Sequence, residues 1–312
     1  MENKSASGHL FASVTILIWG NTFISTKILL VDFQPIEILF FRFVIGLLAL
    51  LIIYPRRLRN TTPRQELTFL AAGLCGVSLY YLMENIALTF TMAANASVII
   101  STPPFFTAIL SQLFLKEEKL QIGFFIGFAI AMTGIFLLSF SGSKLELNPA
   151  GDILALLASF LWDCYSILTK QISSFGYNTI QTTRRIFVYG ILFMIPTLFL
   201  MDFHLGLERF ASPVYLFNIA FLGLGASALC FVSWNFAVRV LGAVRTSVYI
   251  YMVPVITVIM SVFILHERIT VLAFIGMLLI LTGLILSESA NGKRQRQITE
   301  KKRISMFSRM LT

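Results

Sequence analysis

Two carboxylates stand inside long apolar runs of the sequence, Glu84 in one and Asp163 in another. An unpaired carboxylate in a membrane interior is costly, and such groups often mark ion or proton pathways. We therefore expect Glu84 or Asp163 to carry the proton in a proton-coupled process. The alternative is a structural acid that is neutralised or paired, with Arg42 or Arg185 as its partner.

Basic residues are otherwise almost absent from the apolar runs, which makes Arg42 and Arg185 conspicuous. If these guanidinium groups face a cavity, they would favour substrates that carry a carboxylate. The other interpretation is that they reach towards lipid headgroups from positions near helix ends, as long basic side chains can.

Polar and aromatic side chains at interior depth supply the remaining candidates for a substrate site. They are Trp19, Asn21, Tyr80, Tyr81, Asn85, Asn95, Ser101, Trp162, Trp234, Asn235, Tyr249 and Tyr251. Aromatic walls with few polar groups suit an amphipathic small molecule. Aromatic residues near helix ends can instead form the belts that anchor a protein at the membrane surface.

Several motifs that would indicate other functions do not occur in the sequence. There is no Walker A pattern, so we do not expect ATP to drive the protein, and neither HExxH nor GxSxG is present to indicate an integral-membrane enzyme. The cysteines Cys75, Cys164 and Cys230 show no CxxC spacing. We therefore expect no metal site, no cofactor and no disulfide framework.

Composition indicates a polytopic membrane protein. Hydrophobic residues make up 57% of the 312 positions and charged residues 12%, about half the charged share of a soluble domain. The formal net charge of +9 comes from short loops and a tail between apolar spans, where membrane topology accounts for it. We expect a lipid bilayer and a small molecule as partners, and no nucleic acid.

Ten apolar runs are long enough to cross a hydrocarbon core of about 30 Å. They lie at 9–31, 35–54, 66–90, 93–115, 120–140, 150–172, 179–200, 213–238, 243–265 and 269–288. They lack the alternation of barrel strands, and a lipid-exposed backbone must satisfy its own hydrogen bonds. The predicted fold class is therefore all-α, with ten transmembrane helices.

The distribution of Lys and Arg predicts the topology. Sixteen lie in loops and tails on the side of the N-terminus, and three lie in loops on the other side. Positive charge marks cytoplasmic loops, so both termini of this multi-pass membrane protein should be cytoplasmic.

The second half of the chain repeats the first. The stretch from Asn85 to Glu117 returns 150 positions later, at Asn235 to Glu267, and near the start of each half the offset is 143. At that offset Trp19 matches Trp162, Arg42 matches Arg185, and Gly20 matches Asp163. The predicted repeats are 9–140 and 150–288.

Five helices per repeat is an odd number, so the second copy must be inserted upside down relative to the first. Inverted repeats are a transporter architecture in which the substrate lies near the midplane and is exposed alternately to either side. A proline recurs within the fourth helix of each repeat, at Pro104 and Pro254. Each proline removes a helical hydrogen bond, so these bends could be hinges or static kinks.

Together these features resemble a known family, the EamA-type permeases of the drug/metabolite transporter superfamily. The resemblance rests on two five-helix halves that share a set of short motifs. These are Trp19 and Trp162, Asn85-Ile86-Ala87 and Asn235-Phe236-Ala237, Pro104 and Pro254, and Glu117 and Glu267. The resemblance implies a carrier of the cytoplasmic (inner) membrane, often an exporter of small metabolites such as amino acids or amphipathic drugs. A lipid-linked or sugar-conjugate flippase of the same superfamily is the alternative, because the fold does not fix the substrate.

The last stretch, 289–312, is a basic tail with Ile304, Phe307 and Leu311 at helical spacing. It could lie as an amphipathic helix on anionic lipid or remain disordered. The sequence does not fix the oligomeric state.

Overall fold

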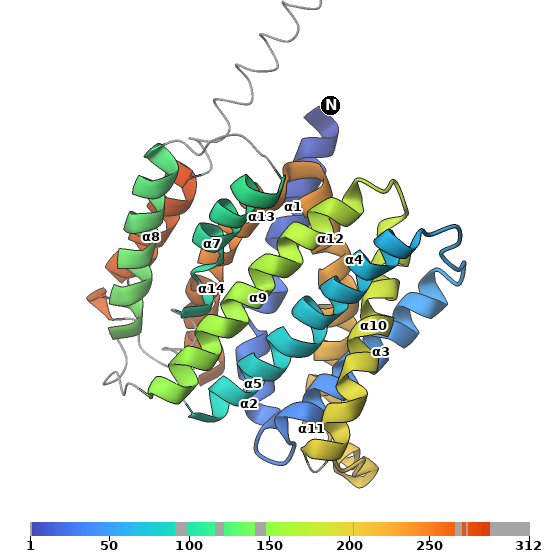
Figure 1. Cartoon of the computed structure of the whole chain (residues 1–312). Coiled ribbons are helices and arrows are strands. Elements are labelled where there is room, and N and C mark those ends of the chain that lie inside the picture. The colour runs from blue at the N-terminus through green and yellow to red at the C-terminus, as the bar shows by residue number, and fades with distance from the viewer. Residues whose placement is uncertain are drawn as a thin grey trace, which may run out of the picture.

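The computed structural model describes residues 2–90, 99–115, 122–140, 148–201, 203–265, 270–272 and 274–287. Within these ranges the chain is helical and forms no strand (Figure 1). Six helices are long and apolar enough to cross a membrane, and four shorter apolar helices lie at Pro103–Leu115, Ile122–Leu137, Ala243–Thr257 and Phe274–Ser287.

The helices of the first half follow one another in a simple order. They are α1 (Glu2–Trp19), α2 (Thr22–Leu29), α3 (Pro35–Ile53), α4 (Pro63–Gly73), η1 (Leu74–Leu79), α5 (Tyr80–Phe90), α7 (Pro103–Leu110), η2 (Ser111–Leu115) and α8 (Ile122–Phe140). The segments α4, η1 and α5 form one continuous helix from Pro63 to Phe90.

The second half has a similar order. It contains α9 (Pro149–Ser173), α10 (Thr179–Leu200), η3 (Leu207–Ala211), α11 (Pro213–Ala220), η4 (Phe221–Leu229), α12 (Cys230–Leu241), α13 (Ala243–Ser247), η5 (Val248–Tyr251) and α14 (Met252–Leu265). The helix Phe274–Ser287 follows. Here α11, η4 and α12 form one continuous helix.

The long helix at 63–90 and its counterpart at 213–241 both contain π-helical turns. These turns occupy Leu74–Leu79 and Phe221–Leu229, and the 150-residue offset places 74–79 on 224–229. In the first of them Gly76 packs so closely on Tyr165 that an added Cβ would lie 2.2 Å from its ring. The π-turns thus occur at matched positions, where helices approach closely.

The helix predicted over 9–31 is broken in the structure. α1 ends at Trp19 and α2 begins at Thr22. At the break Gly20 packs against Ile256, whose Cγ2 would lie 2.5 Å from an added Cβ. The Gly20 carbonyl accepts a hydrogen bond of 2.8 Å from the Thr257 hydroxyl. A glycine at the closest approach of two helices therefore marks the break.

The packing pairs correspond between the halves. α1 packs on α12 and α9 packs on α5, while α3 packs on η4 and α10 packs on η1. In each case a helix of one half packs on the long third helix of the other half. The main core therefore lies at the junction of the halves and contains side chains from both.

A second, smaller core lies beside the main bundle. α8 and the helix at 274–287 stand together at the left of Figure 1 and pack closely through glycines. An added Cβ would lie 2.7 Å from the Gly283 carbonyl at Gly127 and 2.6 Å from the Gly276 carbonyl at Gly134. Small residues let two backbones approach in this way.

Candidate functional site

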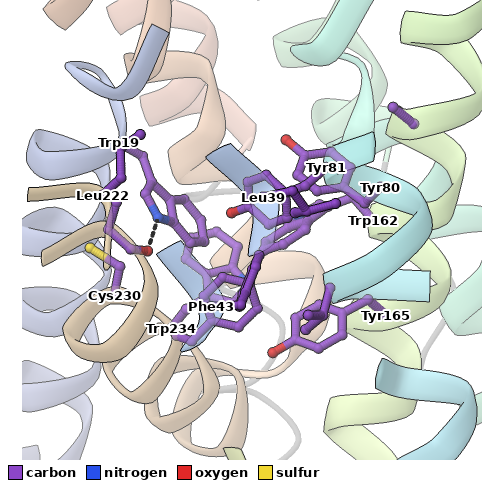
Figure 2. Packing of buried hydrophobic residues seen from close by; sticks show 14 of the residues in the cluster. Trp19, Leu39, Phe43, Tyr80, Tyr81, Trp162, Tyr165, Leu222, Cys230 and Trp234 are labelled. Atoms are coloured by element: carbon purple, nitrogen blue, oxygen red, sulfur yellow. Dashed lines mark hydrogen bonds between the residues drawn. The ribbon is translucent and has the colours of Figure 1, made fainter. Parts of the chain in front are cut away.

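The three tryptophans of the chain meet in the centre of the main core (Figure 2). Trp19 of α1 lies 5.1 Å, between ring centroids, from Trp162 of α9 and 5.1 Å from Trp234 of α12. The Trp19 indole donates a hydrogen bond of 3.0 Å to the Ala226 carbonyl, drawn as the dashed line. Such edge-to-face and tilted ring pairs are favourable arrangements for aromatic side chains.

A cavity opens beside this cluster. Its lining includes Trp19, Thr22, Phe23, Tyr80, Tyr81, Glu84, Ile100, Ser101, Pro103, Trp162, Ile250 and Val253. The empty space, including the mouth, is about 540 Å³, but only about 40 Å³ of it is open to the centres of water molecules. That smaller volume holds roughly three waters. The helices must therefore separate further before the cavity can hold a metabolite.

Glu84 is the acidic side chain of the cavity wall. It is 7% exposed, and its carboxyl interacts with the Tyr80 hydroxyl and, electrostatically, with Arg42. Tyr80 and Tyr81 lie with ring centroids 4.6 Å apart, and Tyr80 also packs on Trp162 at 5.0 Å. The cavity therefore presents one carboxylate framed by aromatic rings.

Arg42 lies behind this wall rather than on it. Its side chain is 1% exposed, its guanidinium carbon is 4.3 Å from the centre of the Tyr81 ring, and its Nε donates a hydrogen bond of 3.0 Å to the Ser227 hydroxyl. The Nη2 atom is buried without a hydrogen-bond partner. A buried cation held by a ring face and one hydroxyl keeps a donor available for an anionic group.

Asp163 lies on α9 outside the described lining of the cavity and is 0% exposed. Its Oδ1 accepts a hydrogen bond from the Thr107 hydroxyl of α7, and its Oδ2 is buried with no partner. The two carboxylates predicted from the sequence therefore occupy different environments. Glu84 borders an open space, and Asp163 is sealed between two helices.

Arg185, expected either to face a cavity or to reach the headgroups, is partly exposed and lies outside the described lining of the cavity. Its Nη2 is 3.3 Å from Glu66 Oε1, and both side chains are a quarter to a third exposed. The neighbouring Arg184 is the buried one, and it donates to the carbonyls of Tyr54 and Arg56 at 2.6 Å each. The Glu66 carboxylate therefore accounts for the position of Arg185 without a substrate.

The other predicted lining residues that the structure describes do not belong to the lining of this cavity. Asn21 bonds to the Leu17 carbonyl, Asn85 to the Pro35 carbonyl, Asn235 to Thr183 and Tyr165, and Tyr249 to His9, while Trp234 and Tyr251 are buried. Asn95, Glu117, Glu267 and the tail 289–312 lie outside the described residues. Of the predicted set, Trp19, Tyr80, Tyr81, Glu84, Ser101 and Trp162 line the cavity.

Both predicted hinge prolines follow an irregular segment. The helix before Pro104 is interrupted at Ser101 and Thr102, and α7 begins at Pro103. The segment before Pro254 is the 3₁₀ turn Val248–Tyr251. A proline cannot donate to the carbonyl four residues earlier, which favours a break at this point in each half.

Several residues of the cavity wall were not predicted from the sequence, because their side chains are apolar. Ile100 matches Ile250 and Pro103 matches Val253 at the 150-residue offset, and all four line the cavity. The repeat itself was the signal that could have identified them. Tyr165, which donates a hydrogen bond of 2.8 Å to Asn235, carried no such signal, since its match is Thr22.

The fold and the cavity define a class, a multi-pass membrane protein whose helices surround a central cavity. The sequence profile of the EamA-like transporter family matches residues 6–140 and again residues 149–288. The chain therefore belongs to the EamA-like transporter family, and it is a membrane transporter.

Relatives agree with this assignment. An uncharacterized transporter of Archaeoglobus fulgidus is 29% identical over 291 residues, covering 89% of this chain and 96% of its own. A protein of Streptantibioticus cattleyicolor named "Probable terminal-alkyne amino-acid exporter" is 24% identical over 285 residues, covering 91% and 94%. A solved crystal structure with 18% identity superposes with a TM-score of 0.69 over 90% of this chain and 98% of that one, which supports the fold.

Proposed function

We propose that this protein is a secondary transporter that exports small amphipathic metabolites, such as amino acids or drugs, across the cytoplasmic membrane by alternating access. The observation that carries the proposal is the central cavity, which has aromatic walls from both halves of the chain and one carboxylate, Glu84. The amino-acid exporter among the relatives agrees with this class of solute.

The chemistry of the wall favours a solute with a cationic group and an apolar body. Glu84 would bind an ammonium group, while Trp19, Trp162 and Tyr80 offer ring faces for apolar or cationic contact. Arg42, with its unpartnered Nη2 behind Tyr81, would attract a carboxylate once Tyr81 moves. A zwitterion such as an amino acid satisfies both charges.

Alternating access is supported by reciprocal contacts between the two proposed repeats, 9–140 and 150–288. Gly127 packs on Gly283 and Gly134 on Gly276, whereas the sequence matches Gly127 with Gly276 and Gly134 with Gly283. Such an exchange of partners is what a two-fold relation between the halves produces. It supports ten spans arranged as two inverted five-helix repeats, in which either side of the membrane can be opened by equivalent movements.

The positions of the cavity residues support an opening towards the side of the membrane opposite the N-terminus. Thr22, Phe23 and Glu84 lie in the halves of their spans remote from the N-terminal side. Towards the N-terminal side the Tyr165–Asn235 hydrogen bond and the buried Trp234 ring close the core. With both termini cytoplasmic, the structure would face outward. The basic tail 289–312 would then meet the anionic lipid of the inner leaflet.

The energy for export would come from a proton gradient, with Glu84 and Asp163 as the candidates for the coupling residue. Both carboxylates are buried in membrane-spanning helices, where a charge that is not paired is costly.

A thermal-unfolding screen of the purified protein tests the proposal, because a ligand that binds only the folded state raises the melting temperature. L-Leucine and L-phenylalanine should raise it, and N-acetyl-L-phenylalanine, which lacks the ammonium group, should not. Glu84→Gln should remove the effect, and the surface control Glu66→Gln should keep it. Well-folded protein that responds to none of the amino acids, nucleosides, polyamines or cationic drugs would contradict the proposal.

A further inference from the structure

Two side-chain oxygens on one face of α9 have no hydrogen-bond partner. They are Oδ2 of Asp163 and Oγ of Ser166, both fully buried. Residues three apart on a helix lie on the same face, one turn from each other. The carboxylate oxygen can only accept, whereas the serine hydroxyl can donate or accept. A buried polar atom without a partner is costly, the more so when it is charged.

A proton on Asp163 Oδ2 would remove the negative charge that this buried oxygen carries without a partner among the described residues. The Thr107 hydroxyl donates to the other oxygen, Oδ1, and can do so in both protonation states. The ionised acid therefore leaves a buried charged oxygen without a donor, and the protonated acid does not.

This carboxyl also lies at a joint that borders the cavity. α7 is attached to α9 by two side-chain hydrogen bonds, from Thr107 to Asp163 and, at 2.9 Å, between Thr102 and Ser159. Thr102 lies between Ser101 and Pro103, which both line the cavity. A solute that pushes on Ser101 or Pro103 therefore acts on the segment that Thr107 ties to Asp163.

Other titratable groups do not compensate the Asp163 charge. The elements packed on α9 carry Arg64 and Glu66 of α4, Cys75 of η1, Tyr80, Tyr81 and Glu84 of α5, Cys230 and Arg239 of α12 and Arg245 of α13. Among the described residues, none of these groups is a hydrogen-bond or ion-pair partner of Asp163, whose hydrogen bond comes from Thr107.

We propose that Asp163, with Thr107 as its hydrogen-bond donor, is the proton site of the transporter, and that Glu84 is a solute-binding residue rather than a second proton carrier. Ionised Asp163 holds α7 through a charge-assisted hydrogen bond from Thr107, and such bonds are about twice as strong as neutral ones. Uptake of one proton on Oδ2 weakens that hold and frees α7 to move beside the cavity. The assignment of a coupling role rests on the proposed function, whereas the proton site itself does not.

Infrared difference spectroscopy of the protein in liposomes tests the proton site without any solute. A pH titration of the wild type should show the carbonyl band of a buried carboxylic acid. Asp163→Asn should remove this band and Glu84→Gln should retain it. Thr107→Val should shift the midpoint of the titration, and the matched control Thr257→Val should leave it unchanged. A band that survives Asp163→Asn, or that disappears in Glu84→Gln, would overturn the proposal.

The two proposals fail in different ways. If the amino acids produce no thermal shift but the Asp163 band titrates as described, the solute assignment is wrong and the proton site stands. If solutes bind but the band does not depend on Asp163, the proton site is wrong and the solute assignment stands. Asn at 163 is nearly the same size as Asp and can still accept from Thr107, so this variant is expected to fold.

Discussion

Two threonine hydroxyls occupy matched places in the two halves and differ in their acceptors. Thr107 of α7 donates to the Asp163 side chain, whereas the hydroxyl of Thr257 of α14 lies within hydrogen-bond distance of the Gly20 carbonyl and of the Val253 carbonyl in its own helix. The 150-residue offset matches the two threonines, and the 143-residue offset matches Gly20 with Asp163. The fourth helix of the first half is therefore bonded to a carboxyl group, which titrates, and the fourth helix of the second half is bonded to a backbone carbonyl, which does not.

The difference follows from the backbone around each acceptor. Gly20 lies where the first span breaks between Trp19 and Thr22, so its carbonyl is available to a side chain. α9 runs without interruption from Pro149 to Ser173, and a continuous helix uses its interior carbonyls within the helix. On this uninterrupted helix Asp163 supplies a side-chain acceptor to Thr107. The matched positions 20 and 163 therefore carry different chemistry in the two halves.

The largest effect is expected from Gly20→Asp, which places an aspartate at the position that matches Asp163 in the other half. An added Cβ would lie 2.5 Å from Ile256, and an unpaired buried charge costs about 3–5 kcal/mol. This variant should yield little monodisperse protein in size-exclusion chromatography. Gly20→Ala, which adds only the methyl group, should lose about 1–3 kcal/mol, as overpacked cores do. Wild-type yield and melting temperature in Gly20→Asp would show that the two sites are interchangeable.

The next effect separates the cavity carboxylate from the sealed one. Glu84→Gln should weaken binding of L-phenylalanine about 10- to 100-fold, because a hydrogen bond to a charged group contributes about 1.5–3 kcal/mol. Asp163→Asn should leave the affinity for L-phenylalanine within about threefold of the wild-type value. Isothermal titration calorimetry measures both. Equal losses in the two variants would mean that the carboxylates act as one site.

A smaller effect compares the threonines directly. Thr107→Val leaves the Asp163 carboxyl without its donor and should destabilise the protein by about 1–3 kcal/mol. Thr257→Val should lose about 0.5–1.5 kcal/mol, because a carbonyl at a helix break loses a neutral bond. Only the first variant should change how the melting temperature depends on pH. The same pH profile in both variants would remove the distinction between the halves.

The smallest effect concerns the matched arginines. Arg185 pairs with Glu66 at a partly exposed site, so Arg185→Gln should change stability by about 0–1 kcal/mol. Arg42 is buried against Tyr81 and Ser227, and Arg42→Gln should cost several times more in melting temperature. A larger loss of melting temperature in Arg185→Gln than in Arg42→Gln would show that Arg185 contributes to the core.

The sequence predicted the helical fold and the residues that differ most from a lipid-facing side chain. Trp19, Trp162, Glu84 and Asp163 were recognisable because aromatic repeats and intramembrane acids are unusual. The break at Gly20 was not, since a glycine within an apolar run is compatible with a continuous helix and only the approach of Ile256 distinguishes it.

The sequence also did not predict which groups a polar side chain contacts. Arg184 and Arg185 are adjacent and chemically identical, and which of them turns inward depends on the carbonyls of Tyr54 and Arg56 and on Glu66. Tyr165 could not be identified as part of the closed side of the core, because its hydrogen bond to Asn235 spans two helices that are 70 residues apart. Contacts of this kind depend on how helices dock, and periodicity and spacing do not report docking.

The most direct test of the account is uptake of radiolabelled L-phenylalanine into proteoliposomes under an imposed pH gradient, for the wild type and Asp163→Asn. The wild type should accumulate the amino acid against its concentration gradient and lose this ability when an ionophore collapses the pH gradient. Asp163→Asn should exchange labelled for unlabelled amino acid but should not accumulate it. Accumulation by Asp163→Asn at the wild-type level, or wild-type accumulation that survives the ionophore, would contradict the account.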